Sequence, residues 1–388
     1  MADRTGTFDG VHRRNLSKLL VLAHLEGPLS RARLTAETGL NRSTVASLAS
    51  ELADLGLVEE RPPDPTNRVG RPSPVVAVHP SVQAIVVNPE VDAVTIAAVG
   101  LNARIVVRER LEMDHLVTPA ETADLVAGTL ARWRATELRD ARIVGVGLAV
   151  PGQVRSDDGL VRWAPHLEWT DAPVRALVEA ATGLPAVVAN DASLGARAEH
   201  LFGAGRGVDD LVYLNGGASG IGGGLVVGGR LVGGTRGYAG EFGQNRPGIA
   251  RPDDRRVPDG VLEDEVSRAR LLQAVGLTHA DEPTLAAAIA ASGDRAVAEE
   301  LARQQRILGT ALGNAINVLN PSLIVLGGFL ATLAAHDMDA LEAAVAAQSL
   351  PVACEGLDIR VAELGENRLL IGAAELAFAR LLADPLAD

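Results

Sequence analysis

The sequence is poor in cysteine and has no long apolar run. Its 388 residues include one cysteine, Cys354, which excludes an internal disulfide and a zinc site built on several thiolates. No uninterrupted apolar stretch of about 18 residues is present, so we expect no membrane span. The N-terminal sequence MADRTGTFDGVHRRN lacks the apolar core of a signal peptide. We therefore expect a globular chain of more than one domain in the reducing cytoplasm.

Positive charge is also scarce, and only the N-terminal part has enough of it to balance its acidic residues. Residues 1–75 hold ten basic and nine acidic side chains, a net charge of +1. Residues 76–388 hold 26 basic and 40 acidic side chains, a net charge of −14, which together gives the −13 of the whole chain. An acidic body repels DNA, so any contact with DNA is expected in the N-terminal part.

Residues 10–80 have the pattern of a winged helix-turn-helix domain. A first helix in RRNLSKLLVLAHLEG is expected to end at Gly27-Pro28, and a second to run from an N-cap at Ser30 to Gly39. A third helix in LNRSTVASLASELADLGL repeats apolar residues every three or four positions. The segment LVEERPPDPTNRVGRPSPVVAV then reads as strand, loop and strand, which is a wing.

Two polar sets in this domain are expected to contact DNA. The polar start of the third helix would enter the major groove, and the wing arginines would enter the minor groove. These residues are Arg42, Ser43, Thr44 and Ser47 on the helix, and Arg68 and Arg71 in the wing. The alternative is a three-helix module for protein contacts whose polar face is only solvated.

The body, residues 81–388, repeats one order of elements. Three short strands with tight turns, a long helix and a buried strand occur first in residues 84–150 and again in residues 211–328. We interpret this as a duplicated α/β fold of the ATPase type, with two lobes facing a cleft. In such duplications the first hairpin of each lobe approaches the phosphates of one nucleotide.

Several motifs resemble the ROK family of repressors, unclassified reading frames and sugar kinases. They are GVGLAVPGQV, AVVANDASLGARAEHLFGAG, LNGGASGIGGGLVVGGRLVGGTRGYAGEFG, GVLE and NPSLIVLGG. The resemblance covers nearly the whole chain. It implies a duplicated RNase H-like, actin-like ATPase fold (the ROK sugar kinase fold) behind the N-terminal winged helix-turn-helix domain. The implied lobes are residues 81–190 and 191–388.

The resemblance also implies a set of ligand-binding residues. In ROK kinases the aspartate of the "ND" pair is the general base, a position held here by Asp191, which we expect to be vestigial. Its plainer role, with Asn190, is to hydrogen-bond sugar hydroxyls or to cap the following helix. The full set carried over is Gly152, His166, Asn190, Asp191, Glu241, Gln244 and Glu263.

Three departures from the family pattern bear on function. Gln244 replaces a histidine, and Asp254, Arg256 and Val261 stand where zinc-binding cysteines occur, so we expect no structural zinc. Instead, Asp/Arg pairs within RPDDRR would order that loop. His166 stands where an asparagine commonly contacts sugar.

The first phosphate turn departs most from the family pattern. The turn VVNPEVDAVT has Asn88 for the family aspartate, Pro89 without an N–H donor, and the negative Glu90 for a glycine. We interpret the surviving glycines of LNGGASGIGGGLVVGG as hairpin geometry that no longer grips a nucleotide.

These observations favour a regulator that is not an enzyme and needs no cofactor. It would bind an inverted-repeat operator as a homodimer or homotetramer and release it when a sugar or sugar-like effector binds. Two alternatives remain at this point. One is an ATP-dependent sugar kinase with an added DNA-binding domain, and the other is a regulator controlled by a protein partner.

Overall fold

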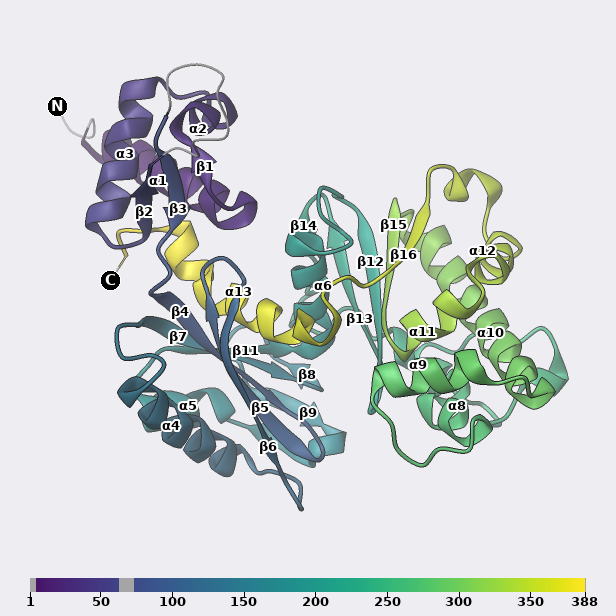
Figure 1. Ribbon diagram of the computed structural model, residues 1–388. Helices are drawn as coiled ribbons and strands as arrows, with labels where there is room; N and C mark the ends of the chain where they lie inside the picture. Colours follow the sequence, from purple (N-terminus) through teal and green to yellow (C-terminus); the bar gives the residue numbers. More distant parts are fainter. Residues whose placement is uncertain (1–4, 63–72, 388) are drawn as a thin grey trace. The chain divides into compact units, whose positions relative to one another are not determined.

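The computed structural model describes residues 5–62 and 73–387 (Figure 1). It divides into two compact units: residues 1–148, 173–188 and 373–388 form the first, and residues 149–172 and 189–372 form the second. The two lobes expected at 81–190 and 191–388 differ from this division in two places. Residues 149–172 belong to the second unit, and the end of the chain returns to the first.

The N-terminal part of the first unit is a winged helix-turn-helix domain. Its helices are α1 (Thr5–Glu26), α2 (Arg31–Thr38) and α3 (Arg42–Asp54). Its sheet, of order β1-β3-β2, consists of β1 (Leu29–Ser30), β2 (Val58–Arg61) and β3 (Val75–Val78). The Ser30 hydroxyl accepts the N–H of Arg33, and Gly39 ends α2 in the left-handed conformation, so both expected caps are confirmed.

The inner faces of these helices form the core of the domain. Leu16, Leu19 and Leu20 of α1 are fully buried. On α3, Val45, Leu48 and Leu52 are buried at three- and four-residue spacing. The helical periodicity of the sequence therefore locates this core correctly.

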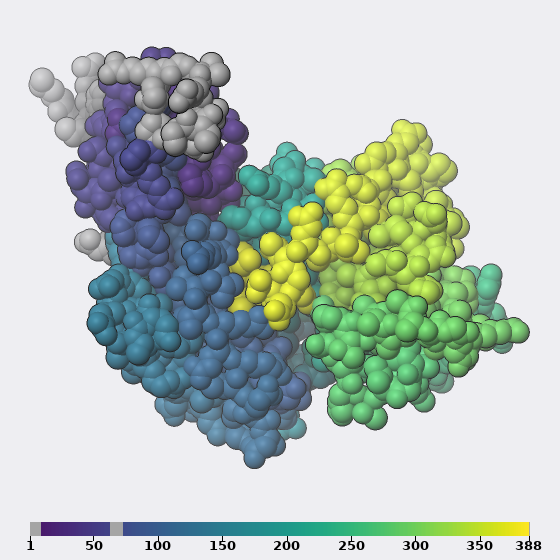
Figure 2. Space-filling model, viewed as in Figure 1, coloured from purple at the N-terminus to yellow at the C-terminus, as the bar shows by residue number. Residues whose placement is uncertain are grey.

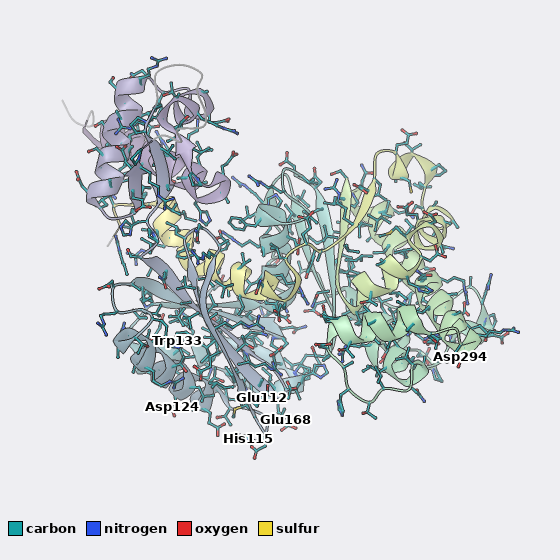
Figure 3. The ribbon with its side chains drawn as sticks, in the orientation of Figure 1. Glu112, His115, Asp124, Trp133, Glu168 and Asp294 are labelled. Carbon is teal, nitrogen blue, oxygen red and sulfur yellow. The ribbon has the colours of Figure 1, made fainter. Side chains whose placement is uncertain are left out.

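The rest of the first unit is built on a five-stranded sheet of order β11-β7-β4-β5-β6. Its strands are β4 (Val82–Pro89), β5 (Ala93–Gly100), β6 (Ile105–Glu112), β7 (Arg142–Val150) and β11 (Ala186–Asn190). Strand β4 is antiparallel to β5 and parallel to β7. Helix α4 (Pro119–Ala135), which buries Trp133, and helix α5 (Val174–Thr182) accompany this sheet (Figure 3).

The second unit repeats this order. Its sheet, β14-β13-β12-β15-β16, consists of β12 (Leu211–Gly217), β13 (Gly220–Val227), β14 (Arg230–Leu231), β15 (Leu323–Gly328) and β16 (Asp358–Val361). Strand β12 is antiparallel to β13 and parallel to β15, just as β4 is to β5 and β7. The expected duplication of the ATPase-type fold is thus confirmed.

Helices and a small sheet complete the second unit. The helices are α6 (Asp191–Phe202), α7 (Leu262–Glu265), α8 (Arg268–Ala274), α9 (Glu282–Ala291), α10 (Arg295–Leu319), α11 (Phe329–His336) and α12 (Met338–Ala346). The small sheet, of order β10-β9-β8, consists of β8 (Gln153–Val154), β9 (Val161–Ala164) and β10 (Trp169–Ala172).

The last helix, α13 (Arg368–Ala383), begins in the second unit and ends in the first. Figure 1 labels this helix in yellow, and the same colour marks the C-terminal part of the chain in Figure 2. Among the described residues, no helix combines the length and the apolar character needed to cross a membrane.

Candidate functional site

All the residues predicted to bind a ligand lie in the second unit, and several of them meet at the start of α6. Asn190 caps this helix, because its side-chain oxygen accepts the N–H of Ser193 at 2.9 Å. Its amide nitrogen donates to the carbonyl oxygen of Gly152 at 3.0 Å and to the Asp191 carboxylate at 3.2 Å. The structure therefore brings Gly152, Asn190 and Asp191 together, as expected.

Asp191 is held in an environment that disfavours its negative charge. Burial is the main cause that raises the pKa of Asp191 to about 6, and the charge of Glu241 adds to the effect. The N–H of Ala192, which donates to the carboxylate at 2.8 Å, and the positive charge of Arg368 act in the opposite direction. This carboxylate is thus close to half-protonated at mildly acidic pH and can both donate and accept hydrogen bonds there.

Glu263 and Gln244 form a second part of the site. The Glu263 carboxylate accepts the backbone N–H of Ile221 at 3.1 Å and the Gln244 side-chain amide at 2.6 Å. Burial raises the pKa of Glu241, and the nearby charge of Glu263 raises it further. Asp191, Glu241 and Glu263 therefore share one electrostatic environment, rich in the acceptors that hydroxyl groups of a ligand need.

The glycines of the β12–β13 hairpin let α6 and Glu263 pack directly against its backbone. A Cβ atom at Gly222 or Gly224 would lie 2.6 or 2.4 Å from the Cβ of Ala192 or Ala196 on α6. A Cβ at Gly220 would lie 2.5 Å from the Glu263 carboxylate. Because these glycines have no side chain, α6 and Glu263 approach the hairpin closely. The Glu263 carboxylate then accepts the backbone N–H of Ile221, which lies beside the turn.

The equivalent hairpin of the first unit, β4–β5, carries charged side chains instead. Glu90 forms an ion pair with Arg110, which also contacts Asp92 at 3.1 Å and Glu112 at 3.0 Å. The backbone N–H of Glu90 donates to the carbonyl oxygen of Ala93 at 2.7 Å. Arg110 thus offsets the negative charge that the sequence places at Glu90. The turn nevertheless has its Glu90 donor engaged and no donor at Pro89.

Long-range ion pairs hold the loop before α7. Asp254 accepts two hydrogen bonds from Arg306 on α10, at 2.9 and 2.7 Å, and this contact is the main cause that lowers the Asp254 pKa. The buried Glu265 carboxylate pairs with Arg303 at 3.0 Å and accepts the backbone N–H of Arg256 at 3.0 Å. The expectation that Asp/Arg pairs inside RPDDRR order this loop is wrong, because these partners come from α7 and α10.

His166 is the remaining residue of the predicted ligand set. It is exposed on the short 3-10 turn η1 (Pro165–Leu167). In the described part of the chain, no hydrogen bond joins it to the other predicted ligand residues. A role for His166 in ligand specificity stays a prediction.

The predicted DNA-contacting residues of α3 lie at the helix start. Arg42, Ser43 and Ser47 are exposed, and Thr44 is partly exposed. The helix cap is Asn41, whose side-chain oxygen accepts the N–H of Thr44 at 2.9 Å and the Ser43 hydroxyl at 2.7 Å. The wing residues Arg68 and Arg71 lie outside the described residues.

Sequence reasoning missed Arg368, the first residue of α13. Arg368 is buried, and its Nε–H donates to the side-chain oxygen of Asn215 at 3.0 Å. The Tyr213 hydroxyl donates to the same oxygen at 3.3 Å. Because the charge of Arg368 also lowers the pKa of Asp191, this arginine belongs to the electrostatic environment of the site. A buried arginine near a helix start has no signature in a single sequence.

Comparisons with known proteins agree with this architecture. The xylose repressor of Caldicellulosiruptor bescii is 25% identical over 394 residues, which cover 96% of this chain and 98% of that protein. The glucokinase of Halalkalibacterium halodurans is 30% identical over 254 residues, which cover 59% of this chain and 74% of that enzyme.

A solved structure extends the likeness over nearly the full chain. It is a ROK family transcriptional regulator, described as a homolog of the E. coli MLC protein, with a TM-score of 0.76 at 25% identity. The matched region covers 97% of this chain and 98% of the chain in that structure. An IclR helix-turn-helix domain matches residues 16–62, and the ROK family matches residues 87–380. This chain therefore belongs to the ROK family.

Proposed function

We propose that this protein is a sugar-responsive transcriptional repressor. Its winged helix-turn-helix domain binds operator DNA, and an aldose sugar or a close derivative binds at the start of α6 and releases the DNA. The observation that carries the proposal is the union in one chain of an exposed, polar start of α3 and a carboxylate cluster held by the glycines of β13.

The chemistry of the carboxylate cluster supports a polyhydroxylated ligand. Asp191, Glu241 and Glu263 supply acceptors for hydroxyl protons, and Gln244 supplies an amide beside them. Relatives named for xylose and glucose make a pentose or a hexose the first compounds to test.

A sugar kinase with an added DNA-binding domain is the second candidate, favoured by Asp191 and by the glycines of the β12–β13 hairpin. Against it stands the β4–β5 hairpin, where Pro89 lacks an N–H and the Glu90 N–H is engaged by Ala93. We propose that the chain does not transfer phosphate. Release of ADP in the presence of ATP and a hexose, lost in Asp191→Asn, would support the kinase instead.

We also propose that the repressor acts as a homodimer or homotetramer on an inverted repeat. In this class of domain, two recognition helices about one DNA turn apart read two half-sites. This part of the proposal rests on the domain type alone.

Release of DNA by sugar tests the proposal directly. DNA selected in vitro by the full chain is labelled, and its binding is followed by fluorescence anisotropy while D-xylose, D-glucose or their phosphates are added. The proposal predicts that at least one sugar weakens DNA binding and raises the melting temperature of the protein. If no sugar does either, control by a protein partner is the better explanation.

A further inference from the structure

One helix, α13, is packed at its start in the second unit and at its end in the first. The boundary between the compact units falls between Gly372 and Ala373, in the middle of this uninterrupted helix. A continuous helix moves largely as a rigid body, so a displacement at its start is felt at its end. The contacts at the two ends of α13 therefore decide which parts of the chain move with this helix.

In the second unit, α13 packs against the elements of the candidate ligand site. Arg368 bonds Asn215 at the end of β12 and contacts Glu282 at 3.4 Å. A Cβ at Gly372 would lie 2.1 Å from the carbonyl oxygen of Leu194 on α6, the helix that begins at Asp191. The backbones of α13 and α6 are thus in direct contact, about one helical turn from the proposed effector.

In the first unit, α13 packs against the DNA-binding domain. Glu375 is 1% exposed, and its carboxylate lies 2.9 Å from Nε2 of His24 on α1, which is 2% exposed. Nδ1 of His24 donates to the carbonyl oxygen of Leu101, in the turn between β5 and β6. The ring of Phe378 lies edge-on to the imidazole at 6.3 Å. His24 and Glu375 therefore form a buried polar pair between α1 and α13.

Two further contacts join α1 to the end of α13 and to Asp384, the residue after it, nearer the surface. The Ser17 hydroxyl donates to the carbonyl oxygen of Leu382 at 2.6 Å, and Arg13 pairs with Asp384 at 2.7 Å. Both Arg13 and Asp384 are partly exposed, unlike His24 and Glu375. Exposed pairs contribute little, whereas a buried polar group that loses its partner bears the full cost of its desolvation. The buried pair is therefore the contact most sensitive to a shift of α13.

We propose that α13 carries the effector signal to the DNA-binding domain, and that the His24–Glu375 pair is the contact through which α1 follows the helix. This inference rests on the proposed function. A ligand at Asp191 shifts α6, the close contact at Gly372 transfers the shift to α13, and Glu375 moves α1 through His24. Without the pair, the sugar still binds but no longer releases DNA.

The test compares buried and exposed pairs in the full-length chain. His24→Gln and Glu375→Gln each break the buried pair, and Arg13→Gln breaks the exposed pair with Asp384 as the matched control. For each variant, the ratio of operator Kd with and without D-xylose or D-glucose is measured, together with the sugar Kd by calorimetry. Relative to the wild type, we expect this ratio to fall at least fivefold in both buried-pair variants and to stay unchanged in the control. The sugar Kd should change less than about threefold in every variant.

The outcomes separate this inference from the function beneath it. If neither sugar releases the wild type, the proposed repressor function fails and the inference falls with it. If the wild type is released and both buried-pair variants keep the full ratio, the inference alone is overturned. Should those variants melt below the assay temperature, Gly372→Ala tests the other contact of α13 while leaving His24 and Glu375 in place. A full ratio in that variant also overturns the inference.

Discussion

The β4–β5 and β12–β13 hairpins occupy the same place in two sheets of the same order, yet they are built from different chemistry. In the first unit Glu90, at the turn of the hairpin, pairs with Arg110 of the neighbouring strand β6. In the second unit the hairpin is mostly glycine, and its missing side chains let α6 and Glu263 approach. The difference teaches that duplication preserved the backbone order, while only the second copy kept the glycines that let a helix and a carboxylate approach its hairpin.

The largest effect on stability is expected when a side chain is added to a glycine of the β12–β13 hairpin. Gly224→Ala places a methyl group 2.4 Å from the Cβ of Ala196, so we expect the free energy of unfolding to fall by about 2–3 kcal/mol. Gly128→Ala in α4 is the matched control, because no atom lies within 4 Å of its added Cβ, and we expect it to be neutral or stabilising by up to about 1 kcal/mol. Denaturant unfolding measures both. Equal losses in the two variants would mean that the hairpin glycines have no special packing role.

The next largest effect is on sugar affinity, and it compares a carboxylate beside the second hairpin with one at the turn of the first. Glu263→Gln removes a charged acceptor from the site, and we expect sugar affinity to fall about tenfold or more, since such hydrogen bonds contribute roughly 1.5–3 kcal/mol. Glu90→Gln, the same substitution at the turn of the first hairpin, should leave sugar affinity within about twofold. Calorimetric titration with the active sugar gives both values. Similar losses in the two variants would contradict the assignment of the ligand to the second unit.

A similar or smaller effect is expected when the DNA-binding surface of the first unit is changed. Arg42→Ala removes an exposed cation from the start of α3, so we expect operator affinity to fall about tenfold, or roughly 1–2 kcal/mol, with a shallower salt dependence. Arg104→Ala, an exposed cation of the same unit outside the domain, serves as control. The comparison between the units fails if Arg42→Ala weakens sugar binding and leaves operator binding intact.

The smallest effect concerns pH. The folded pKa of Asp191, about 6, lies above its unfolded value, so this group stabilises the native state at low pH and the stabilisation is lost as pH rises from about 4 to 6. An asparagine at position 191 does not ionise, so the Asp191→Asn variant does not lose this stabilisation as pH rises. We expect the variant to be more stable than wild type by about 1 kcal/mol at pH 8, allowing for solvent screening, and to show no advantage near pH 4. Thermal unfolding across this range checks the sign, and a variant that is less stable at pH 8 than at pH 4, relative to wild type, would refute it.

Local patterns made much of the fold predictable. The caps Ser30 and Gly39, the buried face of α3 and the repeated order of strands and helices all follow from residues close in the chain. The resemblance to the ROK family also grouped Gly152, Asn190 and Asp191 as ligand residues, and the structure places the three side by side. These features were accessible because short-range propensity and motif order determine them.

The remaining features depend on contacts between residues far apart in the chain. Arg368 reaches Asn215 across 153 positions, and Glu375 reaches His24 only after the chain has returned to the first unit. Pairing of a charged residue with one specific distant partner leaves no periodic trace in a single sequence. For the same reason the pairing of Glu90 with Arg110 was missed, and the partner of Asp254 was sought within RPDDRR instead of on α10.

Hydrogen–deuterium exchange of the full chain, with and without the active sugar, tests the central claim most directly. The sugar should protect backbone amides at the start of α6, in the β12–β13 hairpin and around Glu241 and Glu263, because these segments form the proposed site. The β4–β5 hairpin around Glu90 should exchange at the same rate in both samples, with or without ATP. Protection of the β4–β5 hairpin by ATP, or by the sugar to the same extent as the second hairpin, would contradict the account.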